Sequence, residues 1–243
     1  MSVYVERSGT GATVVFIHGS GWSSRLWHNQ KRLDSSMEVV LIDLPGRGRS
    51  LDPPCDSVEH YRESVYKVLR RQNLFECYIA GHSLGGAIAL SLAQHYPELT
   101  KGIILMGTGA KLKVLPDIFE QIATNRERAV EFITAIAFSP HAPPHLREYA
   151  VAETLKADQN TLHCDFLACD RFDIRDTISS INTPSLVLCG DDDALTPPRY
   201  SEFLHKFLAR SELQIIENAG HMLMLEKPLE VNTVIQRFVE QNS

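Results

Sequence analysis

The chain alternates short, continuous apolar runs with longer stretches in which apolar residues recur every three or four positions. Continuous apolar runs are typical of strands that are buried on both faces of a parallel sheet. Such runs occupy residues 13–17, 39–44, 78–80, 103–106, 185–189 and 213–216. We therefore expect an α/β fold, with a mostly parallel central sheet and helices on both of its faces.

Helical spacing fills most of the intervals between the apolar runs. An almost wholly apolar stretch from Leu84 to about His95 predicts a buried helix, which Pro97 ends. Asp56, with Glu59 three residues later, predicts the N-terminus of an earlier helix. The spacing also predicts a crossover helix over 26–33 and two late amphipathic helices, around 200–208 and 231–239.

One segment breaks this alternation of strands and helices. Residues 111–170 contain no good strand pattern, only helical patterns separated by a proline-rich break at 139–144. Two ordinary crossover helices would need fewer residues, so the length favours a helical lid inserted into the sheet. We expect 1–110 and 171–243 to form the core and 111–170 to form a helical cap.

Composition narrows the class of protein. The 243 residues are 44% hydrophobic and 22% charged, as in ordinary globular proteins. The net charge of −6, without a Lys/Arg run, gives no support for a nucleic-acid or acidic-membrane partner. The first residues do not resemble a signal peptide, and no apolar run reaches the roughly 18 residues of a spanning helix. The five scattered cysteines are typical of reduced thiols, so we expect a cytoplasmic protein.

The clearest chemical motif is Gly-His-Ser-Leu-Gly at residues 81–85, between an apolar strand and an apolar helix. A G-x-S-x-G sequence in this setting predicts a sharp turn with an exposed serine, the nucleophile elbow. Gly81 and Gly85 leave room for strand and helix to approach, and Ser83 stands at the apex. The Leu84 N–H and the positive end of the helix would face whatever Ser83 attacks. An ordinary glycine-rich turn has the same sequence, so the motif alone does not decide.

Three other strand ends carry residues that would complete such a site. Ligands of open parallel sheets bind at the carboxyl ends of the strands. A nucleophilic serine needs a base, usually histidine, the histidine needs a carboxylate, and the oxyanion needs two N–H donors. Asp191, Asp192 and Asp193 follow one strand and are alternative carboxylates. The remaining strand ends are His18-Gly-Ser-Gly at 18–21 and Asn-Ala-Gly-His at 218–221.

These motifs together resemble the α/β-hydrolase fold family, in its small cap-bearing branch, over nearly the whole chain. The resemblance rests on His18-Gly19, on Asp-Leu-Pro-Gly-Arg-Gly-Arg-Ser at 43–50, on the Ser83 elbow, on Gly190-x-x-Asp193-x-x-x-Pro197 and on Gly220-His221. It implies that Ser83 is the nucleophile, Asp193 the acid and His221 the base. It also implies that the backbone N–H groups of Ser20 and Leu84 form the oxyanion hole.

Other residues near these motifs have simpler interpretations. His82 is interpreted as lining the pocket or supporting the site, not as the base, and His18 as structural. Trp22 and Trp27 are candidates for lining the pocket, but core packing is the simpler interpretation. Residues 46–48 lack the third glycine of a dinucleotide-binding motif. No zinc-ligand spacing occurs around residues 163–169, so we expect neither a metal nor a cofactor.

The resemblance also limits the reaction. Haloalkane dehalogenases and epoxide hydrolases of this fold carry an aspartate at the elbow, where this chain has Ser83. C–C hydrolases usually have Gly-Pro-Gly where this chain has Gly21-Trp22, and the similar menaquinone-pathway synthase has an arginine where Ala87 stands. The pimeloyl-carrier methyl esterase docks an acidic carrier on a basic cap, whereas 111–170 has six Lys/Arg and nine Asp/Glu.

We therefore expect a carboxylesterase-type serine hydrolase that cleaves small soluble esters through an acyl-Ser83 intermediate. Hydrolysis of lactones, thioesters or C–C bonds on the same triad remains an alternative. A catalytically silent, ligand-binding member of the fold is a second alternative. The sequence leaves the natural substrate and the oligomeric state open.

Overall fold

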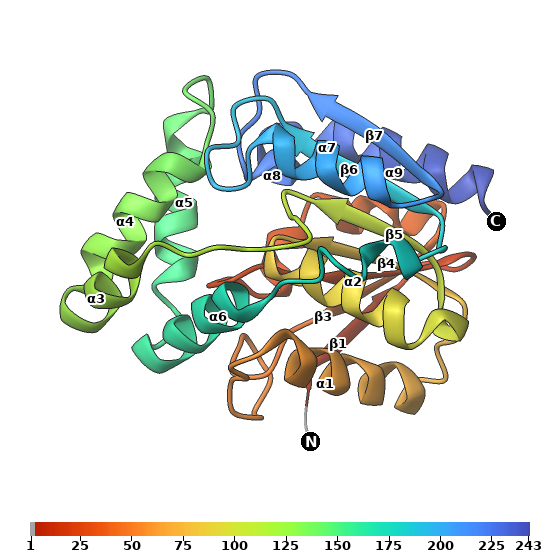
Figure 1. The fold of residues 1–243 in the computed structure, drawn as a ribbon, viewed down its shortest axis with the longest axis horizontal. Helices are drawn as coiled ribbons and strands as arrows, with labels where there is room; N and C mark the ends of the chain where they lie inside the picture. Colours follow the sequence, from red (N-terminus) through yellow and green to blue (C-terminus); the bar gives the residue numbers. More distant parts are fainter. Residues whose placement is uncertain (1–2) are drawn as a thin grey trace.

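A computed structural model describes residues 3–243, so residues 1 and 2 of the expected core segment lie outside the description (Figure 1). The sheet has the strand order β1-β3-β2-β4-β5-β6-β7, in which β1 is antiparallel to β3 and all other pairs are parallel. The predicted mostly parallel sheet is confirmed. The strands are β1 (Val5–Ser8), β2 (Thr13–Ile17), β3 (Glu38–Ile42), β4 (Cys77–His82), β5 (Thr100–Met106), β6 (Ser185–Gly190) and β7 (Ser211–Ile216).

Two apolar clusters lie on opposite faces of the sheet, and alternate residues of β2 enter each of them. Val15 and Ile17 belong to one cluster, Val14 and Phe16 to the other, which explains the continuous apolar run. Helices α1 (Val58–Arg71), α2 (Leu84–His95) and α7 (Pro198–Phe207) contribute to the first cluster. The second is covered by η1 (Ser24–Trp27), η2 (Gln30–Ser35), α8 (Leu223–Glu226) and α9 (Pro228–Gln241).

Four helices follow β5 and precede β6, and Figure 1 shows them grouped at one end of the molecule. Their side chains build a third apolar cluster that includes Ile122, Val130 and Leu162. The last of these helices runs one residue beyond the predicted boundary at 170. The helices are α3 (Pro116–Thr124), α4 (Arg126–Ala137), α5 (Pro144–Thr154) and α6 (Gln159–Arg171); η3 (Pro97–Leu99) and η4 (Ile178–Ser180) are short turns elsewhere.

The structure corrects two predictions of elements and adds one strand that was not predicted. The crossover helix over 26–33 is wrong, because the segment forms two short 3-10 turns, η1 and η2. The N-cap of α1 is Ser57, whose hydroxyl accepts a hydrogen bond from the His60 N–H, whereas Asp56 pairs with Arg171. The edge strand β1 was not predicted, because its four residues are mostly polar and only half-buried.

Candidate active site

Ser83 stands between β4 and α2 with φ +52° and ψ −115°, a backbone conformation that L-residues seldom adopt. The flanking glycines make this turn possible. A Cβ on Gly81 would lie 2.1 Å from the Gly85 carbonyl oxygen, and a Cβ on Gly85 would lie 2.1 Å from that of Ile17. Both positions therefore exclude any larger residue, as the steric interpretation of the motif requires.

Hydrogen bonds hold the strained turn in place. The Ser83 N–H donates to the Met106 carbonyl at 2.9 Å. The Ser83 carbonyl accepts from the Gly86 N–H at 2.9 Å and from the Thr108 hydroxyl at 2.8 Å. Strained residues persist only where their surroundings fix them in this way, and they concentrate at functional sites.

His221 pairs with Asp193 in the structure. The His221 Nδ1 lies 2.9 Å from Asp193 Oδ2, and the two side chains are 6% and 0% exposed. Because a carboxylate only accepts, Nδ1 carries the proton in this pair and Nε2 is the basic nitrogen. Asp192 is exposed and bonds to the Ser139 hydroxyl, so of the three aspartates only Asp193 meets the histidine ring.

Four donors converge on the Asp193 carboxylate. Besides the histidine ring, it accepts from the N–H groups of Leu195 (2.9 Å) and Thr196 (2.8 Å) and from the Thr196 hydroxyl (2.8 Å). These four bonds fix the orientation of the carboxylate against the histidine ring. Thr196 also lies 3.2 Å from His221 Nδ1, a contact that no sequence motif indicated.

The turn after β2 approaches Ser83 closely. A Cβ on Gly19 would lie 3.2 Å from the Ser83 Cβ and 2.8 Å from the Nδ1 of His82, so only glycine fits there. Ser20, the next residue, is half-buried and lines the same cavity as Ser83. Leu84 is the first residue of α2, where N–H groups have no partner within the helix.

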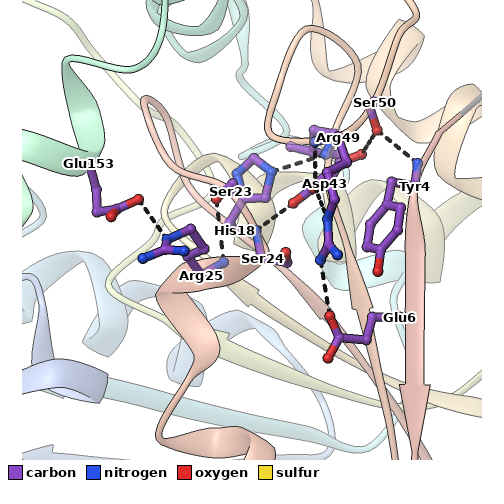
Figure 2. A network of polar contacts seen from close by, with 11 residues as sticks. Tyr4, Glu6, His18, Ser23, Ser24, Arg25, Asp43, Arg49, Ser50 and Glu153 are labelled. Carbon is purple, nitrogen blue, oxygen red and sulfur yellow. Dashed lines mark hydrogen bonds and ion pairs between the residues drawn. The ribbon is translucent and has the colours of Figure 1, made fainter.

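His18, at the start of this turn, and Asp43, after β3, belong to the polar network of Figure 2. His18 Nε2 accepts from the Leu44 N–H at 3.0 Å, and burial lowers the pKa of the ring. The Asp43 carboxylate accepts from the N–H groups of Ser24 (2.7 Å) and Arg49 (2.8 Å). These contacts agree with a structural role for His18. They also show that Asp43, the first residue of the 43–50 motif, binds backbone N–H groups of two segments of the chain.

His82 is buried beside the His221 ring, with ring centroids 4.6 Å apart. Its Nε2 lies 3.1 Å from the His221 carbonyl oxygen. Burial is the main cause that holds the pKa of His82 well below its usual range, and the neighbouring His221 lowers it further. A ring that remains neutral donates to this carbonyl, so His82 lines the pocket and contacts the backbone of His221.

A cavity of about 450 Å³ opens over Ser83, His221, Ser20 and His82. Its size is typical of pockets for small molecules. Most of the lining is apolar, and half of the lining residues come from the segment of four helices at 116–171; Trp22 also lines the cavity, whereas Trp27 is fully buried against Phe16. Side chains from these helices that line it include Ile118, Ile122, Val130, Phe132, Ile133, Ile136, Phe138, Leu162 and Phe166.

Residues 3–243 contain no group of three or more His, Cys, Asp and Glu side chains that could hold a metal ion, and all five cysteines are unpaired. No helix of the described chain is long and apolar enough to cross a bilayer. The expectation of a site without cofactor remains a prediction.

Comparisons with known proteins place the chain in a family. Residues 12–228 match the family model of the alpha/beta hydrolase fold. A pimeloyl-[acyl-carrier protein] methyl ester esterase of Aeromonas hydrophila is 29% identical, over 98% of this chain and all of that protein. A thermophilic esterase structure is 33% identical with a TM-score of 0.87, over 99% of both chains.

An esterase from Exiguobacterium antarcticum shares the fold alone, with a TM-score of 0.92 at 23% identity over 98% of this chain and 95% of that one. Its likeness extends across the sheet and the helices at 116–171 together, because nearly the whole chain is covered. The chain thus belongs to the alpha/beta hydrolase fold family, as a hydrolase of the esterase type.

Proposed function

We propose that the protein hydrolyses carboxylic esters of small soluble substrates through an acyl-Ser83 intermediate. The observation that carries the proposal is the arrangement around one cavity: a serine held in a strained turn and a histidine whose Nδ1 is bonded to a buried carboxylate. A serine hydroxyl becomes a useful nucleophile only with such a base.

In the proposed reaction, Ser83 Oγ attacks the ester carbonyl carbon and His221 Nε2 takes the hydroxyl proton. The imidazolium that forms is stabilised by Asp193, which remains ionised. The carbonyl oxygen becomes an oxyanion, and the N–H groups of Ser20 and Leu84 donate to it. The C–O bond then breaks, and the alcohol leaves with the proton from Nε2.

Hydrolysis of the acyl-enzyme repeats these steps with water as the nucleophile. His221 Nε2 takes a proton from the water, whose oxygen attacks the acyl carbon. When the tetrahedral intermediate collapses, Ser83 Oγ leaves and regains the proton from His221. The carboxylic acid is released and the enzyme returns to its starting state, so no external cofactor enters the balance.

The helical segment 111–170 serves, in this proposal, as a cap that roofs the acyl pocket. Its apolar side chains make most of the cavity lining, and Lys113, which also lines the cavity, pairs with Asp170. An uncharged acyl chain fits this surface. The segment has three more acidic than basic residues, which disfavours an acidic carrier protein as part of the substrate.

A panel of p-nitrophenyl esters, lactones and thioesters tests this assignment. We expect the largest kcat/KM among the esters, with Ser83→Ala reducing turnover to near the uncatalysed level. The Ser83 hydroxyl contributes no core packing, so the variant should keep the thermal unfolding midpoint of the wild type. A higher kcat/KM for lactones or thioesters would reassign the substrate class, and an ester hydrolase activity that survives in Ser83→Ala would overturn the proposal.

A further inference from the structure

Asp165 on α6 is buried at the junction between this helix and the core. Its side chain is 1% exposed, and three groups from the core donate to it. Oδ2 accepts from the Gly21 N–H at 3.0 Å and forms an ion pair with Arg47 Nη2, while Oδ1 accepts from the Tyr61 hydroxyl at 2.6 Å. Gly21 follows Ser20 directly, so this carboxylate contacts the turn to which we assign an oxyanion donor.

The ion pair is poorly suited to stabilising the fold. Arg47 is 2% exposed and donates through Nη2 alone, to Asp165 and to the Thr161 carbonyl at 3.4 Å. Its Nε and Nη1 have no hydrogen-bond partner among residues 3–243. Buried pairs with unsatisfied donors are seldom more stabilising than apolar side chains of similar volume. We therefore look for the role of the Arg47–Asp165 pair in the geometry that it imposes on the turn at Gly21.

Helix α6 contacts the turn at two further points. The Cys169 thiol lies 3.5 Å from the Ser20 hydroxyl. Gly21 has φ +77°, and a Cβ there would lie 3.3 Å from Leu162 and 2.8 Å from Thr154. The turn is therefore enclosed by α5 and α6, and its only charged contact from these helices is Asp165.

We propose that Asp165 is a positioning residue that fixes the Ser20–Gly21 peptide and thereby the oxyanion donor of Ser20. Arg47 and Tyr61 hold the carboxylate so that one oxygen always faces the Gly21 N–H. This inference rests on the proposed function. It means that α6, which also lines the cavity, is a fixed part of the catalytic framework.

A matched pair of double variants isolates the hydrogen bond to Gly21. D165N/R47M keeps an acceptor oxygen for the Gly21 N–H without either charge, and D165L/R47M removes the acceptor. We expect D165L/R47M to have a kcat at least about tenfold below that of D165N/R47M, since losing an oxyanion donor outright costs about 100- to 1000-fold. KM should be similar, and inhibition by a trifluoromethyl ketone, which forms an oxyanion on Ser83, should weaken by the same factor.

Asp158→Asn serves as a control on the same helix, because the Asp158 carboxylate caps α6 by accepting from the Thr161 N–H and makes no hydrogen bond to residues 18–21 among the contacts described. It should leave kcat unchanged. Equal kcat in the two double variants would overturn the proposal. If either double variant fails to fold, Tyr61→Phe tests the same point, because it removes only the hydroxyl that donates to Asp165 Oδ1 and keeps the aromatic ring in the core; an unchanged kcat would then contradict the role of Asp165. Loss of activity in Ser83→Ala together with equal double variants would reject this inference alone and leave the proposed function intact.

Discussion

Burial and hydrogen bonding distinguish the three consecutive aspartates after β6. Asp193 points into the protein and receives four hydrogen bonds, whereas Asp191 and Asp192 are exposed. Spacing in the sequence favoured Asp193 only through a family resemblance, because three adjacent carboxylates look alike in a pattern of residues. Two partners of Asp193, Leu195 and Thr196, follow it within three residues in the sequence. The third, His221, is 28 positions away, and only the fold brings it to the carboxylate.

Asp193→Asn tests this choice of carboxylate. The amide would favour the wrong histidine tautomer, so we expect kcat to fall by up to about ten-thousand-fold, as the same change does in serine proteases. Asp192→Asn is the matched control and should change kcat less than about twofold, since the exposed Asp192 side chain bonds only to the Ser139 hydroxyl among the contacts described. Steady-state kinetics on one p-nitrophenyl ester measure both. A damaging Asp192→Asn beside a mild Asp193→Asn would show that the assignment is wrong.

The elements differ in how well the sequence predicted them. The elbow helix α2 runs from Leu84 to His95, as predicted, because its start is imposed by the turn at Ser83 and its apolar face by burial. Residues 26–33 carried a helical pattern but form 3-10 turns, and apolar residues spaced three apart fit either kind of helical turn. The strand β1 is stabilised by pairing with β3, and a pattern of four residues contains no information about that partner.

The sequence predicted a helical segment over 111–170, and several large apolar side chains of that segment line the cavity. Ile122, Phe132, Ile133, Ile136 and Phe138 do so. Phe119 does not; it packs edge-on against His163, with ring centroids 5.5 Å apart. Helical periodicity identifies the apolar face of a helix but not which part of that face meets a neighbouring helix.

The roof that we propose for the acyl pocket predicts how the rate depends on acyl chain length. Each methylene that enters an apolar pocket contributes at most about 0.8 kcal/mol, or roughly fourfold in binding. The kcat/KM of p-nitrophenyl esters should therefore rise over the first acyl carbons and stop, or reverse, at medium length. A profile that is flat, or that still rises at long chains, would rule out a closed pocket.

Ile122→Ala should move this optimum toward longer chains, because Ile122 lines the cavity from α3. Ile181→Ala is the matched control: both side chains are 1% exposed, but Ile181 lies in the main core and does not line the cavity. Both variants should lose about 2–5 kcal/mol of stability. Only the first should change the chain-length profile, and equal profiles would contradict the assignment of the pocket wall.

For the whole molecule, the sequence predicted the α/β class and the family, because five motifs at strand ends must occur in a fixed order. It did not predict the buried contact of Asp165 with Arg47, Tyr61 and Gly21, since these residues are up to 144 positions apart. A contact between a side chain of the inserted helices and the core leaves no pattern in the neighbouring sequence from which it could be predicted. The division into core and cap and the cytoplasmic location remain predictions.

Detection of the acyl-enzyme tests the central claim most directly. The protein is mixed with a short-chain p-nitrophenyl ester, quenched in acid within the first turnovers and analysed by intact-protein mass spectrometry and peptide mapping. The account predicts a transient mass increase of one acyl group, located on the peptide that carries Ser83 and absent from Ser83→Ala. Steady release of p-nitrophenol without an adduct on Ser83, or with an adduct on another residue, would contradict it.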